Sequence, residues 1–201
     1  NTTGYYNSAF GHFALYSNTT GHQNAAFGTN ALWKNTTGIS NVAVGAYALE
    51  ESTTASYNVA VGYQALSANT TGEYNTALGT RALYNNTTGN RNTAIGRYAL
   101  YKNTTSWDNV AIGNEALYNY EGSEGTLIAI GSQAGYNTNE HLMAIGYQAL
   151  YNNTSGSQNM AFGWKSLYNN TTGSGNLGIG DDTLYSNTTG DYNVGIGWRA
   201  L

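Results

Sequence analysis

The sequence predicts an all-β fold, a parallel β-solenoid of about twelve 17-residue coils with a flattened, two-walled cross-section. A glycine recurs twelve times along the 201 residues, at spacings of 17 six times, then 18, 15 and 17 three times. Small and large apolar residues alternate before each glycine, which is typical of a strand, and a polar Asn-Thr-Thr-Gly segment punctuates most units. A short period is kept along a whole chain only when each repeat contacts its neighbours in a stack.

Each unit is too short for two helices and a turn, whereas its length suits an extended coil. At roughly 3.3 Å per residue, 17 residues give a perimeter of about 56 Å, which two walls of about 17 Å placed about 10 Å apart nearly use up. We expect one continuous domain over residues 1–201, a segment of a longer array, with irregular repeats at about 115–142.

The unit opens with an asparagine four residues before the glycine, in ten of twelve copies; Leu127 and Leu142 take the other two places. Stacked amides can bond to one another along a rod, so we expect an internal ladder. Alanine stands two residues before the glycine in ten copies and glycine in the last two, which indicates a tight space.

A large apolar residue directly precedes every glycine. In a strand it points away from the alanine, so both faces of this wall are apolar. Either the alanines line the core and the large residues need cover from another copy, which we favour, or the large residues fill the coil. The column comprises Phe10, Phe27, Val44, Val61, Leu78, Ile95, Ile112, Ile130, Ile145, Phe162, Ile179 and Ile196.

The repeated glycines are expected at a corner that needs positive φ or a close backbone approach. They are Gly11, Gly28, Gly45, Gly62, Gly79, Gly96, Gly113, Gly131, Gly146, Gly163, Gly180 and Gly197.

Nine turns carry an N-glycosylation sequon of the type Asn-Thr-Thr or Asn-Thr-Ser. The same pattern also describes an ordinary β-turn, and the two interpretations stay open. The candidate acceptors are Asn1, Asn18, Asn35, Asn69, Asn86, Asn103, Asn153, Asn170 and Asn187.

An aromatic residue stands two positions before most of these asparagines, as at Tyr84, Tyr101 and Tyr151. Rings stacked from coil to coil are favoured over a carbohydrate-binding stripe. Repeated threonine raises ice binding, but neighbours such as Thr19 and Thr20 point in opposite directions if extended, so this signal is weak.

Composition and spacing argue against several function classes. Charged residues make up 9% with a net charge of -4, and the cations are scattered, unlike a nucleic-acid surface. No apolar run approaches the roughly 20 residues of a membrane helix. His12, His22 and His141 lack metal-ligand spacing, and the pairs at 50–51 and 181–182 fit solvated turn carboxylates. We therefore expect no enzyme, no catalytic residue, no metal and no cofactor.

The segment from Asn92 to Ala99, Asn-Thr-Ala-Ile-Gly-Arg-Tyr-Ala, is repeated in pattern from Asn109 to Ala116. It resembles the head repeats of trimeric autotransporter adhesins and is similar to repeats in bacterial and phage tail-fibre-like proteins. The resemblance implies a parallel β-roll, three chains around one axis and attachment to host surfaces. The unit here is longer than the usual head repeat by a turn such as that at 69–72.

Together these features predict a non-enzymatic extracellular rod, a structural or adhesive component of a surface appendage or filament. The expected partners are further copies of the chain, in a filament or a homotrimer, and a host-surface protein or glycan. The alternatives are the receptor-binding head of a trimeric adhesin or phage tail fibre, and an ice-binding solenoid. The irregular region at 115–142, with Glu115, Glu121, Glu124 and Glu140, is either a pair of unequal turns or a feature that sets contact or register.

Overall fold

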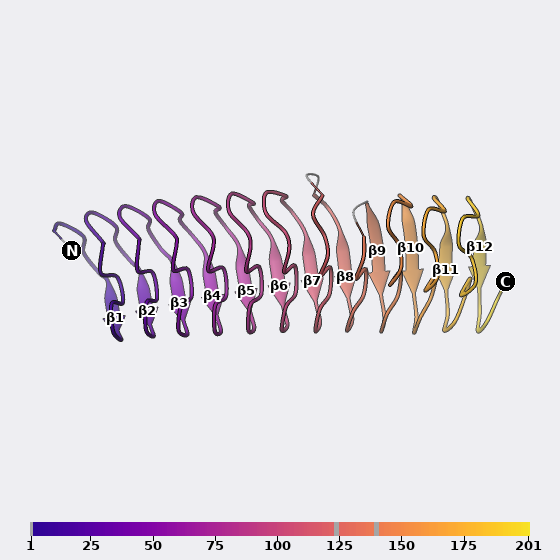
Figure 1. Cartoon of the computed structure of the whole chain (residues 1–201), viewed down its shortest axis with the longest axis horizontal. Coiled ribbons are helices and arrows are strands. Elements are labelled where there is room, and N and C mark those ends of the chain that lie inside the picture. The colour runs from indigo at the N-terminus through magenta and orange to yellow at the C-terminus, as the bar shows by residue number, and fades with distance from the viewer. Residues whose placement is uncertain (1, 123–124, 139–140) are drawn as a thin grey trace.

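The computed structural model describes residues 2–122, 125–138 and 141–201. Within them the chain is a rod of stacked coils, each contributing one short strand to a single side of the rod (Figure 1). All strands pair in parallel in chain order, which confirms the parallel β-solenoid. The strands are β1 (Ser8–Phe10), β2 (Ala25–Phe27), β3 (Val42–Val44), β4 (Val59–Val61), β5 (Thr76–Leu78), β6 (Thr93–Ile95), β7 (Val110–Ile112), β8 (Ile128–Ile130), β9 (Leu142–Ile145), β10 (Asn159–Phe162), β11 (Leu177–Ile179) and β12 (Val194–Ile196).

The register is the same from coil to coil, because equivalent residues of the repeat lie side by side. Ala94 of β6 pairs with Ala111 of β7, and Ala111 pairs with Ala129 of β8. The next pairing joins Ala129 to Ala144 of β9, so the 18- and 15-residue spacings leave the sheet unbroken. The extra and missing residues are therefore accommodated in the turns.

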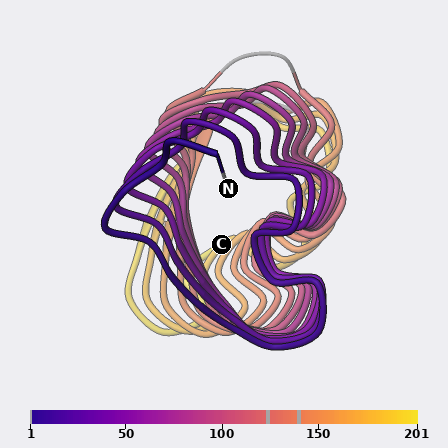
Figure 2. The same cartoon turned by 90° about the vertical axis from the view of Figure 1, so that its left-hand side faces the viewer.

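The expected second extended wall is not present in the described residues, which form one sheet only. The end-on view shows a coil with a long side and an indented side, and the coils rotate gradually along the rod (Figure 2). Hydrogen bonds still join the coils outside the sheet: Leu83 N–H donates to the Ala99 carbonyl at 3.0 Å, and Thr87 N–H donates to the Thr104 carbonyl at 2.8 Å. The second side is thus a hydrogen-bonded stack of turns.

Positive φ angles at side-chain-bearing residues explain why this side turns. In the coil of Gly96, φ is 57° at Tyr98, 51° at Leu100 and 57° at Asp108, and the pattern recurs along the rod. A left-handed conformation costs roughly 1–2 kcal/mol for such a residue. Leu100 is fully buried, and burial of a leucine contributes about 1.5–3 kcal/mol, which offsets the strain.

The core is narrow and built mainly from small side chains. Ala94, Ala99 and Leu100 have no exposed surface, and the same three positions are buried in most coils. Since the strand alanines point inward, the favoured assignment of the two strand faces is confirmed.

Two columns of buried asparagine join the coils inside the rod. In the first, the strand column, the Asn92 backbone N–H and Nδ2 donate to Asn75 Oδ1 at 3.0 and 3.2 Å, and Nδ2 also donates to the Ser106 carbonyl at 2.9 Å. This confirms the expected amide ladder. In the second, the turn column, Asn86 Nδ2 donates to Asn69 Oδ1 at 2.8 Å.

Candidate interaction surface

The outer face of the sheet exposes large apolar side chains along the rod. Each three-residue strand directs its middle residue into the core and the residues on either side outward. Leu78 is 46% exposed and Ile179 is 40% exposed, although both belong to a repeated apolar column. We define the outer sheet face as the residues that stand one and three positions before each corner glycine.

The outer sheet face is continuous because the strands pair without interruption from β1 to β12. At about 4.8 Å per strand it is roughly 50 Å long, and two outward columns make it roughly 10 Å wide. Soluble monomers rarely expose contiguous apolar patches larger than a few hundred Å². A stripe of this size is therefore typical of a surface covered by a partner.

Large aromatic side chains flank this stripe one residue after the corner glycine. Tyr63, Tyr147 and Trp164 are exposed there, and the rings of the last two stack at a centroid distance of 6.0 Å. Met160 of β10 is exposed on the stripe itself. Tyrosine, tryptophan and methionine are enriched in protein interfaces.

The corner glycines combine positive φ with a close backbone approach, as expected. Gly113 has φ of 138°, and a Cβ built there would lie 2.4 Å from the Gly131 carbonyl oxygen. All twelve predicted corner glycines have φ between 114° and 141°. They hold the turn that follows each strand.

The sequon asparagines lie in the turn column, and most of them are buried in the folded rod. Asn86 has no exposed surface, and its Nδ2 uses both hydrogens, toward Asn69 Oδ1 and the Gly89 carbonyl at 3.0 Å. A sugar there would displace a buried hydrogen bond and has no room. Asn187 is only half-buried, and Asn1 lies outside the described residues. The buried members are Asn18, Asn35, Asn69, Asn86, Asn103, Asn153 and Asn170.

The second ladder was not predicted from the sequence, although a signal for it is present. The glycine three residues after most of these asparagines is also typical of an ordinary turn; after Asn103 the position is Ser106. A Cβ on Gly89 would lie 2.3 Å from Asn86 Oδ1 and 2.4 Å from the Ser106 carbonyl oxygen. The spacing Asn-x-x-Gly thus marks a glycine that makes room for an inward amide.

The aromatic column forms a stack, as favoured, and leaves few ring faces for a sugar. Adjacent rings are 4.9 to 5.5 Å apart with planes within 12° of each other. Each interior ring covers both neighbours, and all are half-buried. The stack comprises Tyr84, Tyr101, Tyr118, Tyr136, Tyr151, Tyr168 and Tyr185.

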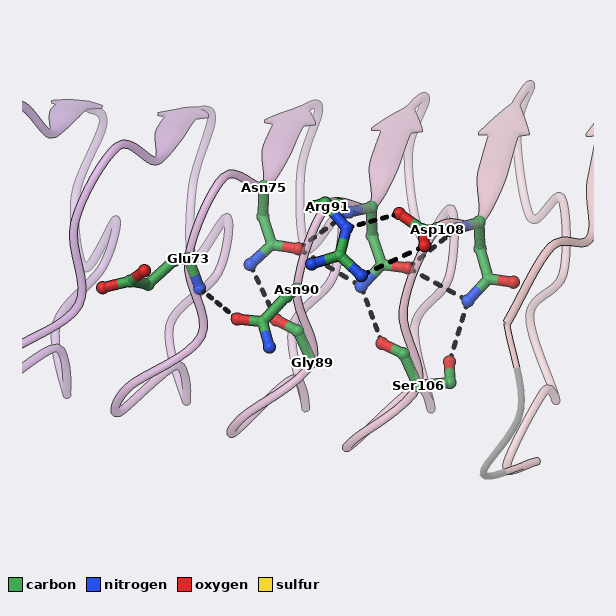
Figure 3. A network of polar contacts seen from close by, with 9 residues as sticks. Glu73, Asn75, Gly89, Asn90, Arg91, Ser106 and Asp108 are labelled. Atoms are coloured by element: carbon green, nitrogen blue, oxygen red, sulfur yellow. Dashed lines mark hydrogen bonds and ion pairs between the residues drawn. The ribbon is translucent and has the colours of Figure 1, made fainter.

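Polar contacts on the rod surface also run from coil to coil (Figure 3). The Arg91 guanidinium donates to both carboxylate oxygens of Asp108, at 2.7 and 3.1 Å, and this hydrogen bond lowers the pKa of Asp108. Asn90 Oδ1 accepts the Glu73 backbone N–H at 2.7 Å. These groups are satisfied by one another, and the pairing resembles a structural ion pair more than a reactive site.

The candidate chemical residues are dispersed. The His22 ring stacks on Tyr5 at 4.6 Å, and Glu51 pairs with Lys34 at 2.6 Å. Asp182 lies 3.6 Å from Arg199. Across residues 2–122, 125–138 and 141–201, no three His, Cys, Asp or Glu side chains gather in a way that could hold a metal ion.

The threonine column is engaged with the backbone. Thr87 Oγ1 donates to the Thr104 carbonyl at 3.1 Å, and Thr70 and Thr171 make the equivalent bond. A hydroxyl that donates to a carbonyl has no proton left to donate to ice, so this geometry does not favour the ice-binding alternative.

The irregular region interrupts both amide ladders. Leu127 and Leu142 occupy the strand column, and Tyr120 occupies the turn column; all three are buried. The Leu127 backbone N–H still donates to Asn109 Oδ1 at 3.1 Å, so the backbone keeps the register while the side-chain ladder stops. Of the acids that marked this region, Glu124 and Glu140 lie outside the described residues.

None of the described residues forms a helix long and apolar enough to cross a membrane. A comparison of the chain with known protein families, curated proteins and solved structures gives no match.

Proposed function

We propose that this chain is a non-enzymatic rod that associates with further copies of itself through the outer sheet face, as structural or adhesive material of a surface appendage or filament. The observation that supports this is the column of large apolar residues directly before the corner glycines, which runs without interruption along β1–β12 on the outer face of the sheet. Burial of apolar surface contributes about 25 cal/mol per Å², so covering the stripe provides a driving force for lateral association.

A second copy is the favoured partner, because two such rods share one length, one strand spacing and one apolar column. The same face could pack three chains around one axis, the arrangement of a trimeric adhesin or tail-fibre head, and this is the second candidate. An extracellular location belongs to both versions of the proposal.

The test replaces part of the stripe with alternating charges, in the triple variant Ile95→Glu, Ile112→Lys and Ile130→Glu. These residues are neighbours on β6, β7 and β8, so the new charges pair with one another and the coil is preserved. We expect a folded protein with the circular dichroism of the parent that no longer associates, as measured by light scattering and electron microscopy.

The matched control places the same charges on a turn of neighbouring coils. Asn85→Glu and Asn119→Glu flank Lys102, and all three lie one residue after the stacked tyrosines. This control should associate like the parent. Long uniform fibres of the parent support the structural role, and discrete trimers support the adhesin head. A parent that remains monomeric at all concentrations contradicts both.

A further inference from the structure

Besides the asparagines of the turn column, a second set of asparagines also matches the N-glycosylation sequon. Three turns contain the doublet Tyr-Asn-Asn-Thr, at 84–87, 151–154 and 168–171. In each doublet the first asparagine is followed two residues later by threonine, so it opens an overlapping sequon of its own. The first asparagines are Asn85, Asn152 and Asn169.

The structure separates the two members of each doublet. Asn86, Asn153 and Asn170 are buried with no exposed surface, whereas Asn85, Asn152 and Asn169 are partly exposed. Their column also carries charged side chains, such as Lys34 and Glu51, which are about 40% exposed and pair with each other. Side chains at this position therefore point to solvent.

The hydrogen bonds of the outer amides leave a proton free for substitution. Asn85 Nδ2 donates one bond, to the Tyr101 carbonyl at 3.0 Å, and Asn152 Nδ2 donates one long bond of 3.4 Å to Asn169 Oδ1. A glycosylated amide keeps one N–H, so either bond can persist. Asn170 differs, because its Nδ2 donates to Asn153 Oδ1 and to the Gly173 carbonyl, both at 2.8 Å.

We propose that Asn85, Asn152 and Asn169 are acceptor sites for N-linked glycan. The donor is a saccharide activated as a lipid-linked diphosphate. The amide nitrogen forms a bond to the anomeric carbon and gives up one proton, while the bond from that carbon to the diphosphate oxygen breaks and the lipid diphosphate leaves with the electron pair. The rod then carries sugar on its turns and keeps the outer sheet face clear.

The experiment expresses the chain in a secretory cell with N-glycosylation and maps the glycans of the secreted, folded rod by peptide fragmentation. We expect sugar at the three outer asparagines and none at Asn86, Asn153 and Asn170. A chain modified at a buried asparagine cannot close its coil and should be absent from the folded fraction. Asn119, which lies in the same outer column but is followed two residues later by Glu121, should stay bare.

Overlapping sequons allow matched single variants. Thr87→Ala removes the sequon of Asn85 and keeps that of Asn86, which ends at Thr88; Thr88→Ala does the reverse. We expect the first variant to lose the glycan of this turn and the second to retain it. Thr87→Ser keeps the hydroxyl, the sequon and the bond to Thr104, and should keep the glycan.

Sugar on Asn86, Asn153 or Asn170 in the folded rod would overturn the assignment. So would three bare outer asparagines in cells that modify a co-expressed carrier sequon. Loss of sugar in the Thr88→Ala variant, with Thr87→Ala unaffected, would overturn it as well.

Discussion

Asparagine has a separate role in each column of the rod, and position decides which. In the turn column the amide nitrogen donates to the preceding coil and to its own turn, as Asn35 Nδ2 does toward Asn18 Oδ1 at 2.8 Å and the Gly38 carbonyl at 3.1 Å. Buried groups that keep such bonds contribute modestly, while a broken one costs about 1–3 kcal/mol. The ladder is therefore sensitive to single defects.

One position where the turn-column ladder is interrupted predicts a substitution that stabilises the rod. Ser52 occupies the turn column between Asn35 and Asn69, and Asn35 Oδ1 and Ser52 Oγ are buried without a hydrogen-bond partner among the described residues. The double variant Ser52→Asn with Ala55→Gly should restore the ladder. We expect it to gain about 1 kcal/mol, from the low end of that range, and to raise Tm in thermal unfolding followed by circular dichroism.

The second substitution removes the Cβ three residues later, a position where most coils with an inward asparagine have glycine; Ser106, three residues after the buried Asn103, is an exception. At the equivalent Gly38, a Cβ would lie 2.4 Å from Asn35 Oδ1. Ser52→Asn alone should gain less than the double variant, and Ala55→Gly alone should lose stability through chain entropy. Equal Tm values for the double variant and the parent would show that the ladder is not limiting at this coil.

Elements of the coil differ in how well the sequence predicts them. The strand, its inward alanine and its corner glycine were predictable, because alternation with period two is a property of strands and a glycine kept in every coil marks a fixed corner. The turns were not, since residues such as Tyr98 and Leu100 adopt φ angles that their types ordinarily avoid. Neighbouring coils stabilise these angles by hydrogen bonding and burial, which a single repeat does not reveal.

The same difference between strands and turns explains which candidate sites could be predicted from the sequence. The outer sheet face follows from alternation along a strand and was predictable. Which sequon asparagines are accessible was not predictable from the sequence. It depends on whether residues such as Asn86 point inward, and the turn geometry decides that. The tyrosine stack was predictable because a fixed position in every coil places like rings one above another.

The tyrosine stack predicts a loss of stability at high pH. Burial raises the pKa of Tyr101, Tyr136 and Tyr151 above that of an ordinary tyrosine. A raised pKa in the folded state means that the unfolded chain ionises first. The stabilisation is thus complete below about pH 10, the unfolded value, and is lost as the pH rises through the higher folded values.

Thermal unfolding across this pH range, with tyrosinate absorbance recorded in parallel, measures the effect. Tyr136→Phe keeps the ring between Tyr118 and Tyr151 and removes the phenol, so its Tm should fall less steeply above pH 10. Tyr6→Phe, outside the stack, is the control and should follow the parent. Indistinguishable slopes for all three proteins would contradict the role of the stack.

The stability of the whole rod is approximately the sum of the stabilities of its coils and of the interfaces between neighbouring coils. Deleting coils should therefore identify the weakest interface. Removing residues 114–146 joins Gly113 to Tyr147 and places Gly163 the regular 17 residues after Gly113. β7 then pairs with β10, and Asn109 and Asn159 become neighbours in a continuous ladder. The deletion removes two coils. It also removes Leu127 and Leu142, the leucines that interrupt the strand-column ladder among the described residues.

Deletion of residues 63–96 is the matched control, because it removes two regular coils and also preserves the 17-residue spacing. Shortening a repeat array ordinarily lowers its stability, so this control should have a lower Tm than the parent. The 114–146 deletion should not, since Leu127 and Leu142 replace asparagines in the coils that it removes and the amide-to-amide bonds of the strand column are absent there. If the irregular pair also sets the height at which neighbouring rods align, electron microscopy should show altered assembly for this deletion and parent-like assembly for the control. A lower Tm for the 114–146 deletion than for the control would show that Leu127, Leu142 and Tyr120 stabilise their coils better than the amides do. Unchanged assembly of the 114–146 deletion would contradict the hypothesis that this region sets the register between rods.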